Sequence, residues 1–213
     1  NMIRDQETLT QLVDMIAKFV RERLVPNEHK MAEDNKLPDD ILQEMKELGL
    51  FGLTIPEEYG GLGLTMEEEI LVAIELGRTS PAFRSIMGTN NGIGSAAVIF
   101  NGTDEQKAHY LPKYASGEWI SCFCLTEPEA GSAVTDLQTS ATPDGDGYRI
   151  NGTKVFTSHA WYADVILAYV RFSPGVGGIG SVLIDTKADG VSFGKQTIHL
   201  YLSTLRSNFS CNS

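Results

Sequence analysis

A chain of 213 residues with a formal net charge of −11 is long enough for two modest domains, each with its own apolar core. The acidic balance argues against a nucleic-acid-binding protein, because phosphate backbones are bound by patches of Lys and Arg. The sequence has no run of about 18 apolar, uncharged residues, so we expect no membrane span.

Helical periodicity dominates the first half of the chain. Apolar residues three and four apart predict a helix over residues 6–24 that Pro26 ends. A second helix is expected to begin near Asp39 and to stop at Gly49. The glycines and proline of residues 51–63 predict a long loop after it.

Two capping boxes mark further helix starts. Thr65 with Glu68, and Thr103 with Gln106, each place a hydroxyl at the N-cap and a carboxyl or amide group three residues later. The first box predicts a third helix that runs to about residue 77, and the second predicts a fifth helix that Gly117 ends.

Between them, Ser80 opens a fourth helix, with Pro81 at the first helical position. This helix contains Gly88, Gly92 and Gly94. Each glycine costs roughly 1 kcal/mol relative to Ala in a helix interior. The pattern therefore indicates close approach by a neighbouring helix or by a ligand.

After about residue 118 the apolar period changes from that of a helix to that of a strand. The segments 144–147 (Asp-Gly-Asp-Gly) and 151–152 (Asn-Gly) are typical of hairpin turns. The sequence thus predicts an α+β fold, with an all-α domain over residues 1–117 and a mostly antiparallel, barrel-like or sandwich β domain over 118–195. Strands are expected near residues 119–126, 136–142, 147–150, 153–157, 164–172, 180–186 and 191–194.

The cysteine pattern indicates a reducing compartment. Cys122, Cys124 and Cys211 are an odd number, and their spacing fits neither a disulfide framework nor a zinc site. In a strand Cys122 and Cys124 would face the same side, where at least one is expected to pack into the core.

Three other patterns carry weaker signals. Residues 175–180 match G-x-G-x-x-G, but a strand follows rather than a helix, which favours a mobile hairpin loop over a phosphate site. Glu127 and Glu129 flank a proline, as in a solvated loop. The histidines lack metal-ligand spacing, and Ser158 and His159 diverge as strand neighbours, so neither metal nor Ser/His hydrolase chemistry is expected.

Two segments have the residue types of a flavin site. A flavin needs an apolar wall for its ring, donors to its pyrimidine oxygens and a donor near N5, the atom that receives the hydride. Residues 123–132 and 156–158 offer aromatic rings and hydroxyls on adjacent strands. On composition alone, core packing is the default explanation of such residues.

Three motifs surround these segments: Leu125-Thr126-Glu127-Pro128-x-Ala130-Gly131-Ser132, Asp146-Gly147-Tyr148-x-Ile150-Asn151-Gly152-x-Lys154, and Ala163-Asp164. In order and spacing they resemble the flavin-dependent acyl-CoA dehydrogenases, over roughly nine-tenths of the chain. The resemblance implies a helical domain, a middle β domain and a C-terminal helical bundle. This chain would contain the first two.

The resemblance also implies an activity. A member of the family dehydrogenates the α,β bond of an acyl-CoA thioester in fatty acid metabolism, FAD accepts the hydride, and an electron-transfer flavoprotein takes the electrons. The FAD contacts implied are Phe123, Leu125, Thr126, Ser132, Phe156, Thr157 and Ser158. The substrate contacts implied are Ser132 at the CoA portion, and Ile86 and Thr89 at the acyl pocket. No metal is implied, and the catalytic base is expected in the C-terminal bundle.

Four positions depart from the family pattern. Phe123 stands where Tyr is common, Phe156 where Trp is, Ala133 where Asp is and His159 where Asn is. Ring support and the Ser158 donor survive these changes, so they are expected to tune the site rather than abolish it.

From about residue 196 the likeness ends, and residues 196–213 are interpreted as a divergent tail left by truncation or a frame shift. We therefore expect little or no dehydrogenase activity from this chain alone, and no assured family tetramer. The alternatives are a non-catalytic flavin-binding, acyl-CoA-binding or structural fragment, and an acyl-CoA oxidase or flavin monooxygenase relative. The expected location is the bacterial cytoplasm, or the mitochondrial matrix if a presequence was removed.

Overall fold

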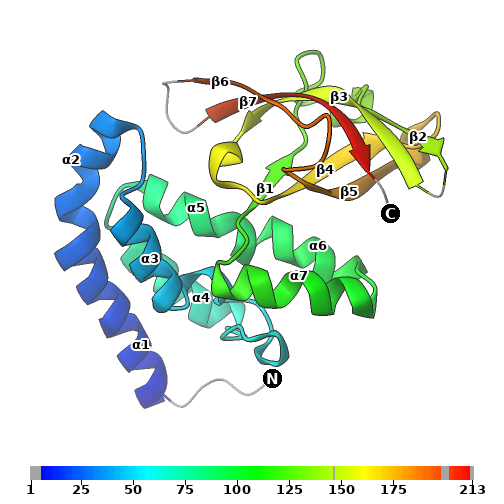
Figure 1. Ribbon diagram of the computed structural model, residues 1–213. Coiled ribbons are helices and arrows are strands. Elements are labelled where there is room, and N and C mark those ends of the chain that lie inside the picture. Colours follow the sequence, from blue (N-terminus) through cyan, green and yellow to red (C-terminus); the bar gives the residue numbers. More distant parts are fainter. Residues whose placement is uncertain (1–5, 146, 198–201, 212–213) are drawn as a thin grey trace. The chain divides into compact units, whose positions relative to one another are not determined.

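The computed structural model describes residues 6–145, 147–197 and 202–211 (Figure 1). Within the chain, two compact units separate: Asn1–Glu118 and Trp119–Ser213. Asp146 and His199 lie outside the described residues, as do residues 198–201 and 212–213 of the tail.

The first unit is helical. It contains α1 (Gln6–Phe19), a π-helical turn η1 (Val20–Leu24), α2 (Val25–Asp34), α3 (Asp39–Glu47), the 3-10 turns η2 (Leu50–Gly52) and η3 (Glu57–Tyr59), α4 (Met66–Leu76), α5 (Pro81–Asn91), α6 (Ile93–Asn101) and α7 (Asp104–Ser116). Both predicted capping boxes are present at the starts of α4 and α7. Gly117 follows α7 in the left-handed conformation and ends it as predicted.

The prediction that Pro26 ends the first helix is wrong. The chain passes from α1 through η1 into α2, and Pro26 lies in the first turn of α2. The N–H of Val25 bonds to the carbonyl of Val20, five residues back, so the backbone forms a wider turn here. A proline in the first turn after such a break removes no required α-helical hydrogen bond.

The single helix predicted after Ser80 is also interrupted. Gly92 has φ −115° and ψ −113°, which is not helical, and it divides the segment into α5 and α6. The side chain of Asn91 steadies this break, because its amide nitrogen donates to the carbonyls of Leu50 (2.6 Å) and Met87 (3.2 Å). The flexible glycine thus serves as a corner between two helices.

Buried apolar side chains from these helices and from the turns around η2 form the interior of the unit. They include Ile16, Leu24, Ile41, Met45, Leu50, Phe51, Ile55, Val72 and Phe83, each fully buried. None of the helices in the described part of the chain combines the length and the hydrophobicity needed to cross a bilayer.

The second unit contains a seven-stranded mixed sheet. Its strands are β1 (Ser121–Cys124), β2 (Ser140–Asp144), β3 (Gly147–Thr157), β4 (Val165–Arg171), β5 (Ile179–Asp185), β6 (Phe193–Thr197) and β7 (Leu202–Cys211). The spatial order is β1-β4-β2-β3-β7-β6, and β5 pairs with β4 along its whole length, from Val165 to Arg171 (Figure 1). The pairs that β4 forms with β1 and β2 are parallel, and the remaining pairs are antiparallel.

Of the two hairpin turns predicted from glycine-containing segments, one is confirmed and one is wrong. The turn at 144–147 is confirmed, because Asp144 pairs with Gly147 across antiparallel β2 and β3. The hairpin at 151–152 is wrong, because both residues lie inside β3. Gly152 is required there for another reason: a Cβ at this position would lie 2.3 Å from Oγ1 of Thr139.

Residues 172–178 connect antiparallel β4 and β5, so the segment 175–180 lies in a hairpin, as predicted, with its last two residues in β5. In the tail, β7 pairs with β3 and β6 over the described residues. Alternate strand residues form most of one core cluster, and both Cys122 and Cys124 pack into it. The cluster includes Cys122, Cys124, Ala141, Ile150, Ala163, Ile166, Ala168, Val170 and Ile184.

Candidate functional site

A β-bulge near the end of β3 shapes the candidate site. Lys154 pairs with Leu205 of β7, and Thr157 pairs with Ser203. Three steps along β3 therefore match two steps along β7, so β3 contains one extra residue between these pairs. Ile150 and Lys154 point inward before the bulge, and Thr157 points inward after it.

The bulge turns Phe156 outward. Its backbone has φ 56°, in the left-handed region that a bulky residue rarely occupies. The ring is 64% exposed. Strained backbone conformations cluster at functional sites, where the surrounding structure maintains the strain.

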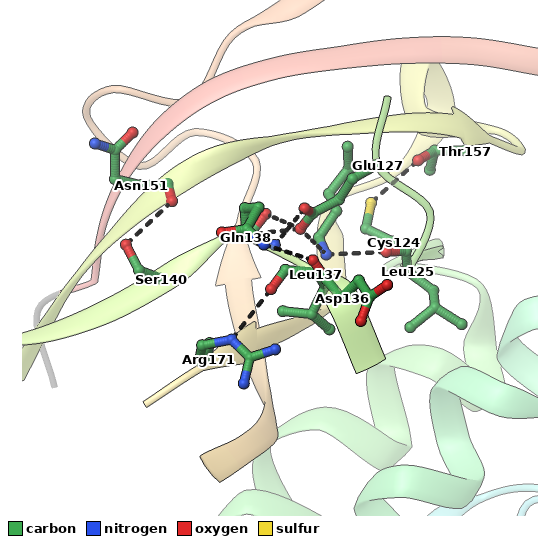
Figure 2. Close-up of polar contacts among 12 residues, drawn as sticks. Cys124, Leu125, Glu127, Asp136, Leu137, Gln138, Ser140, Asn151, Thr157 and Arg171 are labelled. Atoms are coloured by element: carbon green, nitrogen blue, oxygen red, sulfur yellow. Dashed lines mark hydrogen bonds and ion pairs between the residues drawn. The ribbon is translucent and has the colours of Figure 1, made fainter. Parts of the chain in front are cut away.

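The segment after β1 lies against this bulge. The N–H of Val155 donates to the carbonyl of Thr126 at 2.9 Å. Two residues before Thr126 in the chain, Sγ of Cys124 lies 3.3 Å from Oγ1 of Thr157 (Figure 2). The two segments that the sequence analysis selected are thus joined by backbone and side-chain contacts.

Three hydroxyls of the two selected segments are candidates for contact with a ligand. Thr126 and Ser158 are half-buried, and Ser132 is exposed on the turn beyond Ala130. Within the described part of the chain, none of these three side chains forms a hydrogen bond. On β1, Phe123 faces away from the cysteine core and packs edge-on against Tyr169, with ring centroids 5.8 Å apart.

A buried ion pair lies behind the two segments. Nζ of Lys154 donates to Oε1 of Glu127 at 2.8 Å and to the carbonyl of Leu125 at 3.0 Å. The same carboxylate accepts hydrogen bonds from the amides of Gln138 (2.5 Å) and Thr139 (2.9 Å) and from the hydroxyl of Thr139. Lys154 is fully buried and Glu127 is 5% exposed. Figure 2 shows how these bonds converge on Glu127.

The environment favours the charged form of Glu127. Burial acts to raise the pKa of this carboxyl group, but the hydrogen bonds from Lys154, Thr139 and the backbone amides outweigh it and leave the pKa below the ordinary value. Burial lowers the pKa of Lys154, and its bonds to Glu127 oppose that change. Glu127 is therefore a structural anion and a weak base.

The prediction of a solvated loop at Glu127 is wrong, although Glu129 is exposed as expected. The sequence did contain a signal for the pair. Lys154 occupies an inward position of a strand, in step with Ile150, and a lysine at such a position is almost never buried without an anionic partner.

A second cation, the half-buried Arg171, fixes the far side of the same loop. Arg171 donates to the carbonyls of Leu137 (3.2 Å), Gly175 (2.8 Å) and Thr135 (2.6 Å). The sequence analysis did not single out this arginine. Its contacts tie the turn that carries Ser132 to the hairpin loop between β4 and β5.

The structure brings together most of the predicted cofactor contacts. Those at the end of β1 and at the bulge are neighbours: Phe123, Leu125, Thr126, Phe156, Thr157 and Ser158. Ile86 and Thr89 lie on α5 of the helical unit, the former buried and the latter half-buried.

A small cavity beside α5 has a volume of about 20 Å³, roughly the space for one water molecule. Met87 and Gly88 line it, and Ile86 and Thr89 do not. No group of three His, Cys, Asp or Glu side chains among the described residues is placed to hold a metal ion.

Comparison with known proteins decides the family. The model for the acyl-CoA dehydrogenase N-terminal domain matches residues 6–118, and that for the acyl-CoA dehydrogenase middle domain matches residues 122–202. The chain belongs to the acyl-CoA dehydrogenase family. A curated relative, an acyl-CoA dehydrogenase from Bacillus subtilis (strain 168), is 31% identical over 85% of this chain and 48% of its own length.

Solved acyl-CoA dehydrogenases share the fold. The enzyme from Geobacillus kaustophilus has a TM-score of 0.88 and 26% identity over 97% of this chain and 57% of that chain. The Bacillus anthracis enzyme, solved in complex with FAD, has a TM-score of 0.84 and 28% identity over 96% of this chain and 37% of that one. The chain spans about half the length of the acyl-CoA dehydrogenase relatives, or less.

The residues at the bulge fit FAD, the cofactor with which this family has been solved. An exposed aromatic ring, held outward at Phe156, supplies a flat apolar surface. Thr126 and Ser158, both half-buried, carry hydroxyls that can act as donors. A flavin needs both kinds of contact.

Proposed function

We propose that the sheet unit binds the isoalloxazine ring of FAD at the β3 bulge, as part of an acyl-CoA dehydrogenase. One observation carries the proposal. Phe156, a bulky aromatic residue, is held in a left-handed conformation with its ring 64% exposed, directly beside the Thr126 segment. Such an arrangement provides little packing for the protein itself and suits a flat ligand.

Each predicted residue has a defined task in this proposal. Phe156 supports the ring, Phe123 and Leu125 contribute apolar contact, and Thr126 donates to the pyrimidine edge. Thr157 is buried, and its hydroxyl contacts Sγ of Cys124, so it holds β3 against β1 and is not exposed to the ligand.

The hydroxyls of Ser158 and Ser132 are assigned to the reacting atom of the flavin ring and to the substrate. Ser158 donates near N5, and Ser132, on its exposed turn, contacts both the cofactor and the CoA portion of the substrate. For the acyl chain, the proposal retains Ile86 and Thr89 of α5 as contact residues.

When bound, FAD supplies a hydride acceptor for α,β-dehydrogenation of an acyl-CoA thioester, with electrons leaving to an electron-transfer flavoprotein. The residues of the chain orient the ring and exclude water from one of its faces. Glu127 cannot take the substrate α-proton, because Lys154 and two backbone amides hold it as a buried anion with a lowered pKa. The proposal therefore assigns no catalytic base to the bulge.

The test is a visible absorption spectrum of the purified chain, recorded before and after incubation with FAD and desalting. A flavin spectrum near one FAD per chain is expected for the native protein and not for Phe156→Ala. A native protein that stays colourless would overturn the proposal.

A second assay addresses the reaction. The FAD-loaded chain is mixed with acyl-CoA under anaerobic conditions, and bleaching of the flavin is followed. We expect slow or absent bleaching, because no base lies at the bulge. Fast bleaching would contradict that assignment, and rapid reoxidation by oxygen would favour an acyl-CoA oxidase or monooxygenase instead.

A further inference from the structure

The Lys154–Glu127 pair is placed directly behind both halves of the proposed site. Lys154 is the last paired residue before the bulge, two positions before Phe156. Glu127 directly follows Thr126 in the chain. The pair thus lies where a shift of either segment would move a residue proposed to contact the cofactor.

Most of the bonds of the pair hold backbone rather than other side chains. Lys154 binds the carbonyl of Leu125, and Glu127 binds the amides of Gln138 and Thr139. Because Glu127 and Gln138 stand at the two ends of one loop, the carboxylate closes that loop. The exposed turn with Ser132 lies between these ends.

Stability alone does not account for such a pair. The desolvation of two buried charges offsets much of their attraction, and a buried ion pair can often be replaced by uncharged residues without loss of stability. A buried pair that contributes little net stability yet binds three backbone groups around a loop is well suited to fixing geometry.

We propose that Lys154 and Glu127 form a positioning pair, which holds the Leu125–Thr126 segment at the β3 bulge in the arrangement that a flavin ring requires. The inference rests on the proposed function for its flavin part, whereas the ordering of the loop is a property of the protein alone. Neither residue touches the cofactor in this proposal.

Three variants separate positioning from stability. Lys154→Met leaves a buried carboxylate without its cation, and Glu127→Gln leaves a buried ammonium group without its anion, so both are expected to unfold at lower urea concentration. The double variant Lys154→Met/Glu127→Gln has neither charge. Its glutamine oxygen, in the place of Oε1, can still accept from the amide and hydroxyl of Thr139, whereas its NH2 group cannot accept from the amide of Gln138. The double variant is expected to recover most of the native midpoint.

The double variant nevertheless lacks the bond from Lys154 to the Leu125 carbonyl. We expect hydrogen exchange in the peptide that spans residues 121–130 to be at least about tenfold faster than in the native chain, with exchange in β4 and β5 unchanged. The Kd for FAD is expected to rise at least about tenfold, although stability is recovered.

The exposed ion pair between Arg149 and Asp144, on the β2–β3 hairpin, is the matched control. Arg149→Met/Asp144→Asn removes the same charges from the same unit and is expected to leave loop exchange and the Kd for FAD within about twofold of native values.

Two outcomes would overturn the inference. One is a double variant that regains native loop exchange and native FAD affinity together with stability, since that is what a purely structural pair would do. The other is loop exchange that none of the variants changes. If the native chain does not bind FAD at all, the proposed function fails, and the exchange measurement still decides whether the pair orders the loop.

Discussion

Truncation of Phe156 tests the site most directly. Phe156 is 64% exposed, so roughly a third of its surface is buried. Full burial of a Phe side chain contributes about 1.5–3 kcal/mol, which scales to about 0.5–1 kcal/mol here. Phe156→Ala should therefore lower the free energy of unfolding of the sheet unit by no more than about 1 kcal/mol, compared with about 3–5 kcal/mol for a fully buried Phe.

A glycine at the same position separates the ring from the backbone. The left-handed conformation costs a non-glycine residue about 1–2 kcal/mol, which glycine avoids. Glycine in turn loses about 0.5–1 kcal/mol more than alanine when its backbone is ordered. Phe156→Gly should thus equal Phe156→Ala in stability or exceed it by up to about 1.5 kcal/mol, while both lack the ring.

Urea unfolding followed by tryptophan fluorescence reports the sheet unit, because both tryptophans, Trp119 and Trp161, belong to it. A titration with FAD then measures affinity. We expect a roughly tenfold rise in Kd for both variants, from the lost ring contact of about 1.4 kcal/mol. Phe172→Ala, which truncates another partly exposed ring of the same unit, should leave the Kd for FAD unchanged.

This prediction is refuted if Phe156→Ala destabilises the unit as strongly as a core truncation, since the ring would then be packed. It is equally refuted if FAD binds Phe156→Gly as tightly as the native chain.

Three further substitutions have expected outcomes. Gly152→Ala should lower the free energy of unfolding by at least about 2 kcal/mol, because the new Cβ would lie 2.3 Å from Oγ1 of Thr139; an unchanged urea midpoint would show that the strands can separate at no cost. Glu127→Gln should be less stable than the native chain near neutral pH. Because the folded-state pKa of Glu127 lies below its ordinary value of 4.5, the carboxylate stabilises the fold above that pH and the gap should close as pH falls further, which urea titrations between about pH 5 and about pH 3 would measure. Thr103→Ala removes the hydroxyl that accepts from the amide of Gln106 and should lower the free energy of unfolding of the helical unit by about 1 kcal/mol. Unfolding would be monitored by circular dichroism, and an unchanged midpoint would mean that water replaces the hydroxyl.

Local chemistry was sufficient for much of the fold. The capping boxes at Thr65 and Thr103 and the left-handed Gly117 were predictable, because each depends on residues within one helical turn. The change from helical to strand period also marks the second unit correctly, since burial on one face imposes it.

The errors share a different cause. Pro26 does not end a helix because a π-turn precedes it, and Gly152 makes no turn because it pairs with Ser207 of β7 inside β3. In each case a contact or a backbone adjustment elsewhere overrides the local preference. Neither effect can be predicted from the few residues that make up a local turn pattern.

The candidate site could be predicted from the sequence in part. The segments around Thr126 and Phe156 were selected from residue types and from the family resemblance. The bulge that turns Phe156 outward could not be read from the sequence, because it depends on how β3 aligns with β7. The buried pair behind the site was missed as well, since the loop around Glu127 has the composition of a solvated turn.

The extra residue in β3 also limits how this site can change over evolutionary time. In a regular strand, positions 154 and 156 share a face, so no substitution could direct a lysine inward and the ring outward. Substitution can alter which ring is presented, but a one-residue deletion beside it would turn that ring toward the core and remove the site in a single step. The number of residues in β3 therefore determines which face of the sheet carries the ring. A sequence alignment with a gap in β3 would match residues that lie on opposite faces.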